Sequence, residues 1–190
     1  RALLCLAAQR KGMVIKMNIR NAEAADLPAI ETIFSEIHTA EENGLVTIGW
    51  KRGVYPTAVT AEMALKRGDL FVQEDDGKIV GTGIINQQQV DVYNGANWRY
   101  AAADENVMVL HTLVISPTAV RKGYGQRFVA FYEDYARAHG CKNLRMDTNE
   151  KNANARALYK KLGYIEAGVV PCVFNGLEGV HLVLLEKQLS

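Results

Sequence analysis

The sequence predicts a single α/β domain in which a mixed, mostly antiparallel and twisted sheet carries helices on both faces. The length of 190 residues matches one compact domain that can bury a core without disulfides or metal. Periodic segments follow the order β, α, α, β, β, β, α, β, α, β, β, so an antiparallel front half precedes a single βαβ unit. Such an order predicts a sheet with helices packed on both sides.

The first residues are expected to lie outside the domain. An apolar run at residues 3–8 is followed, not preceded, by basic residues, which is the wrong order for a signal peptide, and it is too short to span a membrane. Apolar and polar residues alternate over 14–20, as in a half-buried strand. We therefore expect residues 1–13 to be a disordered or loosely attached extension and residues 14–190 to form the domain.

Two helices follow this strand. Asp26 offers an N-cap, and apolar residues recur after it at helical spacing up to about Gly44. An aperiodic, aromatic segment at 44–60 leads to a short helix at 60–67. Long loops of this kind often line pockets.

The middle of the chain alternates strands with one helix. Strand patterns at 70–73 and 79–86 flank a turn and predict a hairpin. The apolar run 107–115 is typical of a strand buried on both faces. A helix is expected at 123–139, with its apolar positions in one stripe, and a further strand at 144–148.

The last elements are a helix at 152–162, stopped by Gly163, and strands at 164–169 and 180–186. They complete the predicted order. No repeat or low-complexity stretch interrupts it.

Composition argues against several functional classes. With 22 Lys and Arg against 21 Asp and Glu, the net charge of +1 gives no bulk electrostatic reason to bind nucleic acid or an anionic membrane. Cys5, Cys141 and Cys172 are too few and too widely spaced for a disulfide framework, so a reducing, cytoplasmic compartment is expected. The histidines are scattered without an HExxH motif, and we expect no metal.

The segment SPTAVRKGYGQ, at 116–126, joins a predicted strand to a predicted helix. Gly123 and Gly125 stand at the turn, where glycine lets backbone N–H groups approach a ligand and the helix N-terminus favours phosphate. Arg121 and Lys122 add positive charge. The segment therefore predicts a pyrophosphate cradle, and the alternative is a tight turn with a solvated basic edge.

A dinucleotide-binding fold is the competing interpretation, because Asp147 ends the next strand at a suitable place to hold a ribose. Two features argue against it. Phe128 occupies the third glycine position of GxGxxG, and seven residues separate the strand from Gly123 where that fold uses a tight turn.

A second motif, NANARALYKKLGY at 152–164, has the spacing N-x-x-A-x-x-L-Y-x-x-x-G-aromatic. Read with P-x-x-x-x-x-G-x-G at 117–125, it resembles the coenzyme A side of the GNAT N-acetyltransferases. The resemblance covers roughly residues 14–186. It implies a splayed central strand pair, and an enzyme that moves the acetyl group of acetyl-CoA to a primary amine of a small molecule or peptide by direct attack.

The resemblance also carries expectations about partners. Acetyl-CoA is the implied donor, with an amine acceptor and no metal, nucleic acid or membrane; a homodimer is compatible with it. A non-catalytic, coenzyme A-binding sensor or interaction module is the alternative, since a fold can outlive its chemistry.

The resemblance assigns the donor site residue by residue. The backbone N–H of Leu113 would face the acetyl carbonyl, and the backbone of Val114 and Ile115 would pair with pantetheine. Asn152 would bind the pantetheine arm or a nearby backbone. The pyrophosphate would lie on the loop formed by Val120, Arg121, Lys122, Gly123, Tyr124, Gly125 and Gln126. The family usually carries Gln or Arg where this chain has Val120, so no side-chain contact is expected there.

Direct attack needs two proton transfers. An amine with a pKa near 10.4 is only about one part in a few thousand neutral at pH 7, so a group or water chain should accept its proton. His111, two residues from the expected reaction centre, is the candidate base; on a regular strand it would share a face with Leu113. Tyr159 is the candidate acid for the leaving thiolate. Packing is the alternative role for both side chains.

Aromatic residues are candidates for the acceptor wall, namely Trp50, Tyr55 and Trp98, with Tyr124 as a further possibility. Each of them is also a reasonable packing residue. No dense acidic cluster accompanies them, which disfavours polycationic acceptors.

Overall fold

Seven strands form one sheet, in the order β1-β2-β3-β4-β5-β7-β6, in the computed structural model, which describes residues 17–119 and 123–190. Only β4 and β5 are parallel, and the other neighbours are antiparallel. The strands are β1 (Asn18–Asn21), β2 (Leu70–Asp75), β3 (Lys78–Asn86), β4 (Val107–Ile115), β5 (Asn143–Asn149), β6 (Ile165–Phe174) and β7 (Leu177–Gln188).

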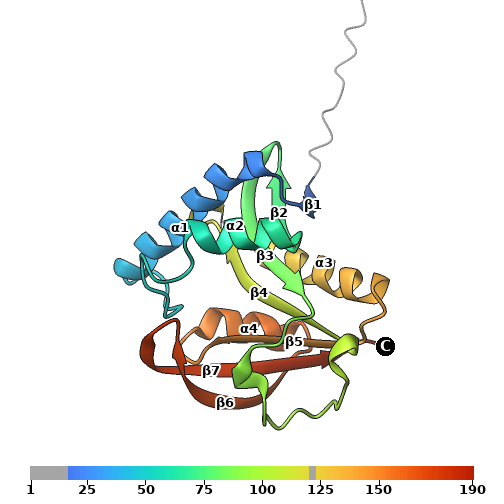
Figure 1. Ribbon diagram of the computed structural model, residues 1–190. Coiled ribbons are helices and arrows are strands. Elements are labelled where there is room, and N and C mark those ends of the chain that lie inside the picture. Colours follow the sequence, from blue (N-terminus) through green and yellow to red (C-terminus); the bar gives the residue numbers. More distant parts are fainter. Residues whose placement is uncertain (1–16, 120–122) are drawn as a thin grey trace, which may run out of the picture.

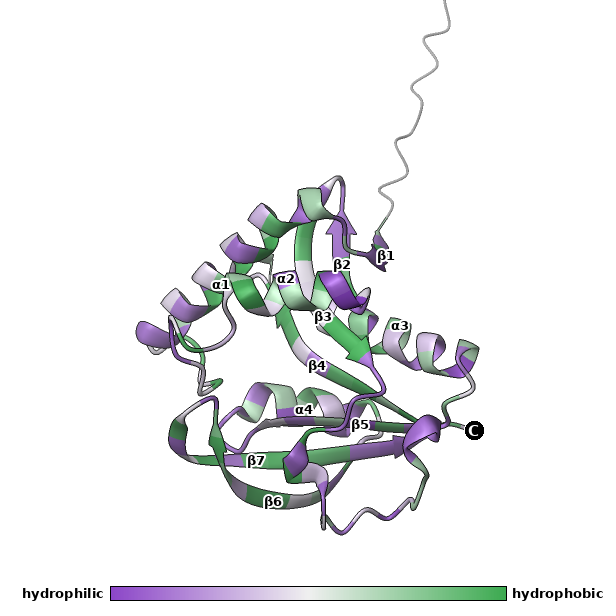
Figure 2. Ribbon diagram, in the orientation of Figure 1, coloured by the Kyte–Doolittle hydropathy of each residue, from purple (hydrophilic) through white to green (hydrophobic). Residues whose placement is uncertain are grey.

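Helices cover both faces of the sheet, as predicted (Figure 1). The helices are α1 (Leu27–Glu42), α2 (Ala58–Arg67), α3 (Tyr124–Ala138) and α4 (Ala153–Lys161). Ile84 packs with α1 and α2, whereas its neighbour Ile85 packs with α3 and α4, which is the alternation expected of a strand. The outer side of α1 is hydrophilic, while β3, β4 and β7 are largely hydrophobic (Figure 2).

A long connection between β3 and β4 covers the rest of the α1 and α2 face. Its Tyr93 is buried in a third apolar cluster with Val107 and Leu182, and Trp98 packs against that cluster. Two 3₁₀ turns, Asp91–Tyr93 and Asp104–Asn106, are the regular structure in this connection.

The order of elements matches the sequence prediction, and the boundaries differ by a few residues. The hairpin predicted from the strand patterns at 70–73 and 79–86 is present as β2 and β3. Asp76 and Gly77 lie in its turn, with φ values of 52° and 76°. The final two strands are longer than predicted and form a second hairpin. The proposed extension at 1–13, and the start of the strand predicted at 14–20, lie outside the described residues; β1 is the described part of that strand.

Asp26 precedes α1, but its side chain makes a different contact from the predicted cap. Its carboxylate accepts hydrogen bonds from the Arg20 guanidinium at 2.7 and 2.9 Å and from the Glu23 backbone N–H at 2.8 Å. The hydrogen bonds from Arg20 lower the pKa of Asp26. The contact ties β1 to the start of α1.

β4 and β5 separate partway along their length. Their register runs from Val107↔Asn143 to Leu110↔Met146 and ends there. Figure 1 shows the two strands meeting near the C-terminus and diverging toward α1. The splayed strand pair that the resemblance implied is therefore present.

A β-bulge lies at the same point. Thr82 pairs with Val114, but Ile84 pairs with His111, so two residues of β4 oppose Gly83. Thr112, at this bulge, has a φ of 51°, which is uncommon for a β-branched residue. Among the described residues, no helix is long and apolar enough to cross a membrane.

Candidate active site

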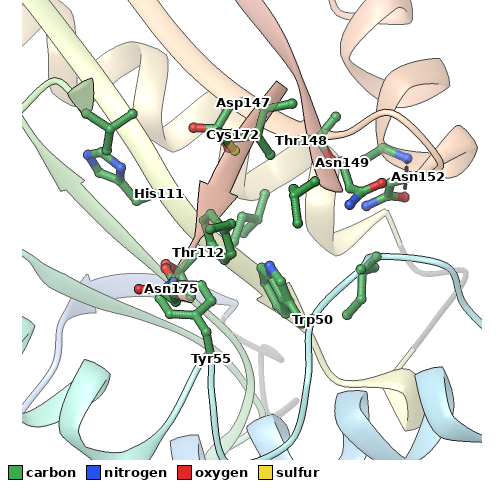
Figure 3. A pocket seen from close by; sticks show the side chains of 18 of the residues that line it. Trp50, Tyr55, His111, Thr112, Asp147, Thr148, Asn149, Asn152, Cys172 and Asn175 are labelled. Atoms are coloured by element: carbon green, nitrogen blue, oxygen red, sulfur yellow. Dashed lines mark hydrogen bonds between the residues drawn. The ribbon is translucent and has the colours of Figure 1, made fainter. Parts of the chain in front are cut away.

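A cavity of about 630 Å³ occupies the gap where β4 and β5 diverge. It is lined by both strands, by α4, by the segment before α2 and by the hairpin of β6 and β7. Figure 3 shows these side chains around one space, with Asp147 and Cys172 at one end and Trp50 and Tyr55 at the other. The main contributors are Trp50, Tyr55, His111, Thr112, Leu113, Val114, Ile115, Asp147, Asn149, Asn152, Tyr159, Cys172 and Phe174.

The cavity reaches both faces of the sheet. Tyr159 belongs to the apolar cluster beneath α3 and α4, whereas Trp50 packs against the cluster beneath α1 and α2. Two molecules entering from opposite faces can therefore meet between the strands.

Leu113, Val114 and Ile115 line this cavity after β5 has turned away. Val114 and Ile115 remain paired with β3 on their other side. On the side of the gap, the backbone N–H and C=O groups of β4 therefore have no neighbouring strand with which to form hydrogen bonds. An extended ligand can pair with them.

His111 and Leu113 lie on opposite faces of the sheet, which corrects the arrangement expected from a regular strand. Leu113 packs against the cluster that contains Met108 and Leu110. Alternation puts His111 on the other face, with Val109. The cause is the bulge at Thr112, which adds one residue and reverses the alternation.

The His111 ring is largely buried and bonded to a neutral amide. Its Nε2 lies 3.0 Å from Oδ1 of Asn86, and because an amide oxygen only accepts, Nε2 carries the hydrogen. Burial lowers the pKa of His111 to about 4. His111 lines the cavity as a neutral and weakly basic group.

The glycine segment opens α3 as predicted. Gly123, at a φ of 72°, is the N-cap residue, and no described side chain caps the helix. The first backbone N–H groups of α3 are therefore available to an anion. At Gly125 an added Cβ would lie 3.3 Å from Cδ2 of Leu158, so the backbone there runs close against α4.

Other residues of the predicted cradle have different positions. Tyr124 is buried, and its hydroxyl donates a hydrogen bond to Asp75, so it does not wall the acceptor pocket. Gln126 is exposed in the first turn of α3. Val120, Arg121 and Lys122 lie outside the described residues.

Asn152 and Tyr159 both line the cavity, from the start and the body of α4. Oδ1 of Asn152 accepts a hydrogen bond from the Ala155 N–H at 3.1 Å, so its side chain caps the helix. Tyr159 is 7 % exposed, and burial raises the pKa of its phenol. The hydroxyl therefore stays protonated at neutral pH.

Trp50, Tyr55 and Phe174 form an aromatic wall on the α1 and α2 face. The ring centroids of Trp50 and Tyr55 are 5.7 Å apart, those of Tyr55 and Phe174 are 5.0 Å apart, and both contacts are edge to face. The Tyr55 hydroxyl also hydrogen-bonds the Thr112 hydroxyl. The bulge in β4 is thereby tied to the wall.

Trp98 is not part of this wall, in contrast to our expectation. The guanidinium of Arg145 lies 4.1 Å from the centroid of its ring, and its indole N–H donates to the carbonyl of Tyr93. Trp98 thus holds the connection between β3 and β4 against the sheet.

A carboxylate fixes the backbone beside Trp50. Glu41 accepts hydrogen bonds from the N–H groups of Ile48 and Gly49, at 2.7 and 3.0 Å. Gly49 has a φ of 77°, and an added Cβ there would lie 2.2 Å from Nδ2 of Asn149. Glycine is therefore required for this segment to reach the end of β5.

Asp147 and Phe174 are cavity residues that the sequence alone did not place here. Asp147 follows Met146, the last residue of β5 that pairs with β4. The hydroxyl of Tyr93 donates to its Oδ2 at 2.8 Å, and burial raises the pKa of the carboxyl. Among the described residues, no three His, Cys, Asp or Glu side chains gather as metal ligands.

Comparisons with known proteins agree with this geometry. The model of the acetyltransferase (GNAT) family matches residues 29–164. An uncharacterized N-acetyltransferase of Bacillus subtilis (strain 168), YhfO, is 25 % identical over 150 residues, which are 79 % of this chain and 91 % of that protein.

Solved structures share the fold. A GNAT-family acetyltransferase from Streptococcus agalactiae is 24 % identical, with a TM-score of 0.77, over 92 % of this chain and 96 % of that one. A putative acetyltransferase from Salmonella typhimurium, solved with its cofactor acetyl-CoA, is 21 % identical, with a TM-score of 0.63, over 92 % and 94 % of the two chains. The family model covers both sequence motifs, and the cavity lies between the two splayed strands. This chain belongs to the GNAT family of acetyl-CoA-dependent N-acetyltransferases.

Proposed function

We propose that this protein transfers the acetyl group of acetyl-CoA to a primary amine of a small molecule or peptide, and that the amine attacks the thioester directly. The observation that carries the proposal is the cavity between β4 and β5, which has helix α4 on one side and an aromatic wall on the other. Direct attack requires both molecules in one site at once, and a gap through the sheet provides that.

The donor side fits acetyl-CoA in two respects. The uncapped start of α3, beside the close approach at Gly125, suits a pyrophosphate. The unpaired edge of β4 suits the amide groups of pantetheine, which both donate and accept hydrogen bonds. The Salmonella relative solved with acetyl-CoA supports the same assignment. Bound there, acetyl-CoA would supply an activated acyl group.

Leu113 is proposed to stabilise the transition state. Its backbone N–H belongs to the stretch of β4 that lines the cavity without a partner in β5. Negative charge develops on the acetyl oxygen as the amine attacks, and an N–H group fixed in the strand stabilises that charge without rearrangement.

Tyr159 is proposed as the acid that protonates the leaving thiolate. It reaches the cavity from α4, on the donor side, and a phenol is protonated at neutral pH, so it has a proton to give when the thiolate forms. His111 and Asp147 are the cavity groups that could accept the amine's proton, both from the opposite face.

The first test is thermal unfolding with acetyl-CoA and, separately, with NAD. A ligand at about a hundred times its Kd stabilises by about 2.7 kcal/mol. We expect a shift with acetyl-CoA alone; a shift with NAD alone, or with neither, would contradict the donor assignment.

Release of free coenzyme A with a panel of amines is the second test. Amine-dependent release supports the enzyme. Stabilisation by acetyl-CoA without release from any amine or peptide would instead indicate a coenzyme A sensor.

A further inference from the structure

We infer that Asp147 receives the ammonium group of a small cationic acceptor and takes its proton, with Tyr93 holding the carboxylate in place. This inference rests on the proposed function and adds the chemical class of the acceptor and the identity of the base. It starts from a carboxylate that the cavity holds without a cation.

The carboxylate lies where the strands part. Asp147 is the first residue of β5 beyond the last pair with β4, and it shares a face with Arg145, opposite to Met146. That is the face of His111 and of the aromatic wall, on the acceptor side of the gap. Figure 3 shows Asp147 at the end of the cavity away from Trp50.

One side chain holds it. Tyr93, itself 3 % exposed and packed edge-on to Trp98, donates its hydroxyl to Oδ2 at 2.8 Å. Tyr93 cannot supply positive charge, and its own pKa is raised well above the usual range by burial. It therefore positions the carboxylate without neutralising it.

Among the described residues, no positively charged side chain forms an ion pair with Asp147. Among residues 17–119 and 123–190, none of the ion pairs involves it, and Tyr93 is its hydrogen-bond partner. Arg145 is directed elsewhere, to the Gln89 side chain and the Trp98 ring. An uncompensated carboxylate in a cavity is costly, and a cationic ligand removes that cost.

Titratable groups face Asp147 from every element around it. Burial raises the pKa of each of the neighbouring Tyr55, Tyr93, Tyr159 and Cys172, and the negative charge of Asp147 adds a smaller rise. The remaining titratable groups of the cavity are His111 on β4 and Asp91 in the β3–β4 connection. Asp91 is exposed, whereas Asp147 is half-buried and lines the cavity where the strands part, so Asp147 is the carboxylate placed to meet an amine.

The proton inventory is complete without a further reagent. Asp147 takes one proton from R–NH₃⁺ to give R–NH₂. The nitrogen lone pair forms the N–C bond, the C–S bond breaks, and its electrons go to sulfur. The second nitrogen proton reaches sulfur through Tyr159, and Asp147 returns its proton to solvent.

Desolvation helps the first transfer. Burial disfavours the carboxylate and the ammonium alike, so it raises the pKa of the acid and lowers that of the amine. The two values approach each other. His111, with its pKa near 4 and its Nε2 bonded to Asn86, is the weaker candidate for this role.

The size and walls of the cavity define the acceptor. The cavity of about 630 Å³ also holds the thioester end of the donor, so the acceptor has only part of that volume. That part is bounded by Trp50, Tyr55 and Phe174, and it suits a single ammonium on a short apolar or aromatic body. One half-buried carboxylate does not suit a polyamine.

The test uses the full-length protein and acetyl-CoA with three probes: benzylamine, n-butylamine and a short peptide with an alanine N-terminus. Asp147→Asn should lower kcat/KM for benzylamine by about a hundredfold or more and remove the acidic limb of its pH profile, while acetyl-CoA affinity is retained. Asp134→Asn, which removes an exposed carboxylate from α3, is the matched control.

Tyr93→Phe separates positioning from packing. Because the Tyr93 hydrogen bond lowers the pKa of Asp147, its loss should move the acidic limb to higher pH and lower kcat/KM by about tenfold. His111→Gln should leave that limb in place. A limb that survives Asp147→Asn, or disappears with His111→Gln, would overturn the inference.

A second readout does not depend on turnover. The raised pKa of Asp147 means that the folded state loses stability as the pH rises through that pKa. The Asp147→Asn variant should therefore unfold at a higher temperature than the wild type at pH 7. An equal or lower unfolding temperature would contradict the claim that the Asp147 carboxylate lacks a compensating cation.

The outcomes separate the two proposals. If acetyl-CoA does not bind, and no probe causes release of free coenzyme A, the proposed function itself is wrong. If the peptide is acetylated and both small amines are refused, the function stands and the inference about the acceptor fails.

Discussion

Leu110 and Met146 form the last pair between the parallel strands β4 and β5, and the cavity proposed as the active site begins directly beyond them. β4 remains paired with β3 as far as Ile115, and β5 remains paired with β7 as far as Asn149. Each strand keeps its outer partner, so the gap opens without loss of the sheet. The inner backbone edges remain available to a ligand.

Tyr159→Phe should lower kcat by about a hundredfold, because the phenol is the proposed acid. The affinity for acetyl-CoA should be nearly unchanged, since the ring that packs edge-on to Tyr164 is retained. Steady-state kinetics and calorimetric titration with acetyl-CoA check both statements. An equal loss of rate and affinity would mean that the hydroxyl has a structural role.

Gly125→Val should weaken coenzyme A binding by tenfold or more. A Cβ added at this position would lie 3.3 Å from Leu158, and the two further methyl groups of valine would displace the backbone of the proposed cradle. Gly168→Ala is the control, because a Cβ there meets no atom within 4 Å. Calorimetric titration with coenzyme A measures the effect, and unchanged binding would contradict the phosphate-loop assignment.

His111 should make the protein sensitive to acid. Its pKa is lowered from 6.5 to about 4 in the folded state, so the unfolded state binds more protons between these values. Stability is fully present above about pH 6.5 and is lost as the pH falls toward 4, by about 3 kcal/mol for this group.

Denaturant unfolding of the wild type and of His111→Gln at pH 7 and pH 4 measures this loss. The variant should lose less stability than the wild type on acidification. An identical pH dependence would show that the ring is not held neutral.

Phe174→Ala should raise KM for the acceptor several-fold and leave acetyl-CoA binding unchanged. It removes one end of the aromatic wall, on the face opposite to α4. Val169→Ala, on the same strand and 49 % exposed, is the control. Kinetics with benzylamine at saturating acetyl-CoA separates the two substrates, and a change confined to acetyl-CoA would place Phe174 on the donor side.

The order of elements and the helix starts at Gly123 and Asn152 were predictable because they depend on local signals. Helical spacing predicts α1 and α3, and the turn at Asp76 and Gly77 predicts the hairpin of β2 and β3. The spacing from Asn152 to Tyr164 predicts a helix and a turn within a single segment.

The acceptor side was not predictable in the same way, because it depends on contacts between distant segments. Tyr55 meets Phe174, and Tyr93 meets Asp147, without any sequence signal that links them. The bulge at Thr112 depends on the register between β3 and β4, and it separates His111 from Leu113. Gly83 lies opposite the bulge, and a glycine inside a strand can mark a bulge. Hydrophobic periodicity takes no account of such a glycine.

A crystal structure with coenzyme A bound tests the central claim most directly. The account predicts that the pyrophosphate lies at the start of α3, that pantetheine pairs with Val114 and Ile115, and that the sulfur lies between Leu113 and Tyr159. Coenzyme A bound outside the gap between β4 and β5, or with its sulfur remote from Tyr159, would contradict it.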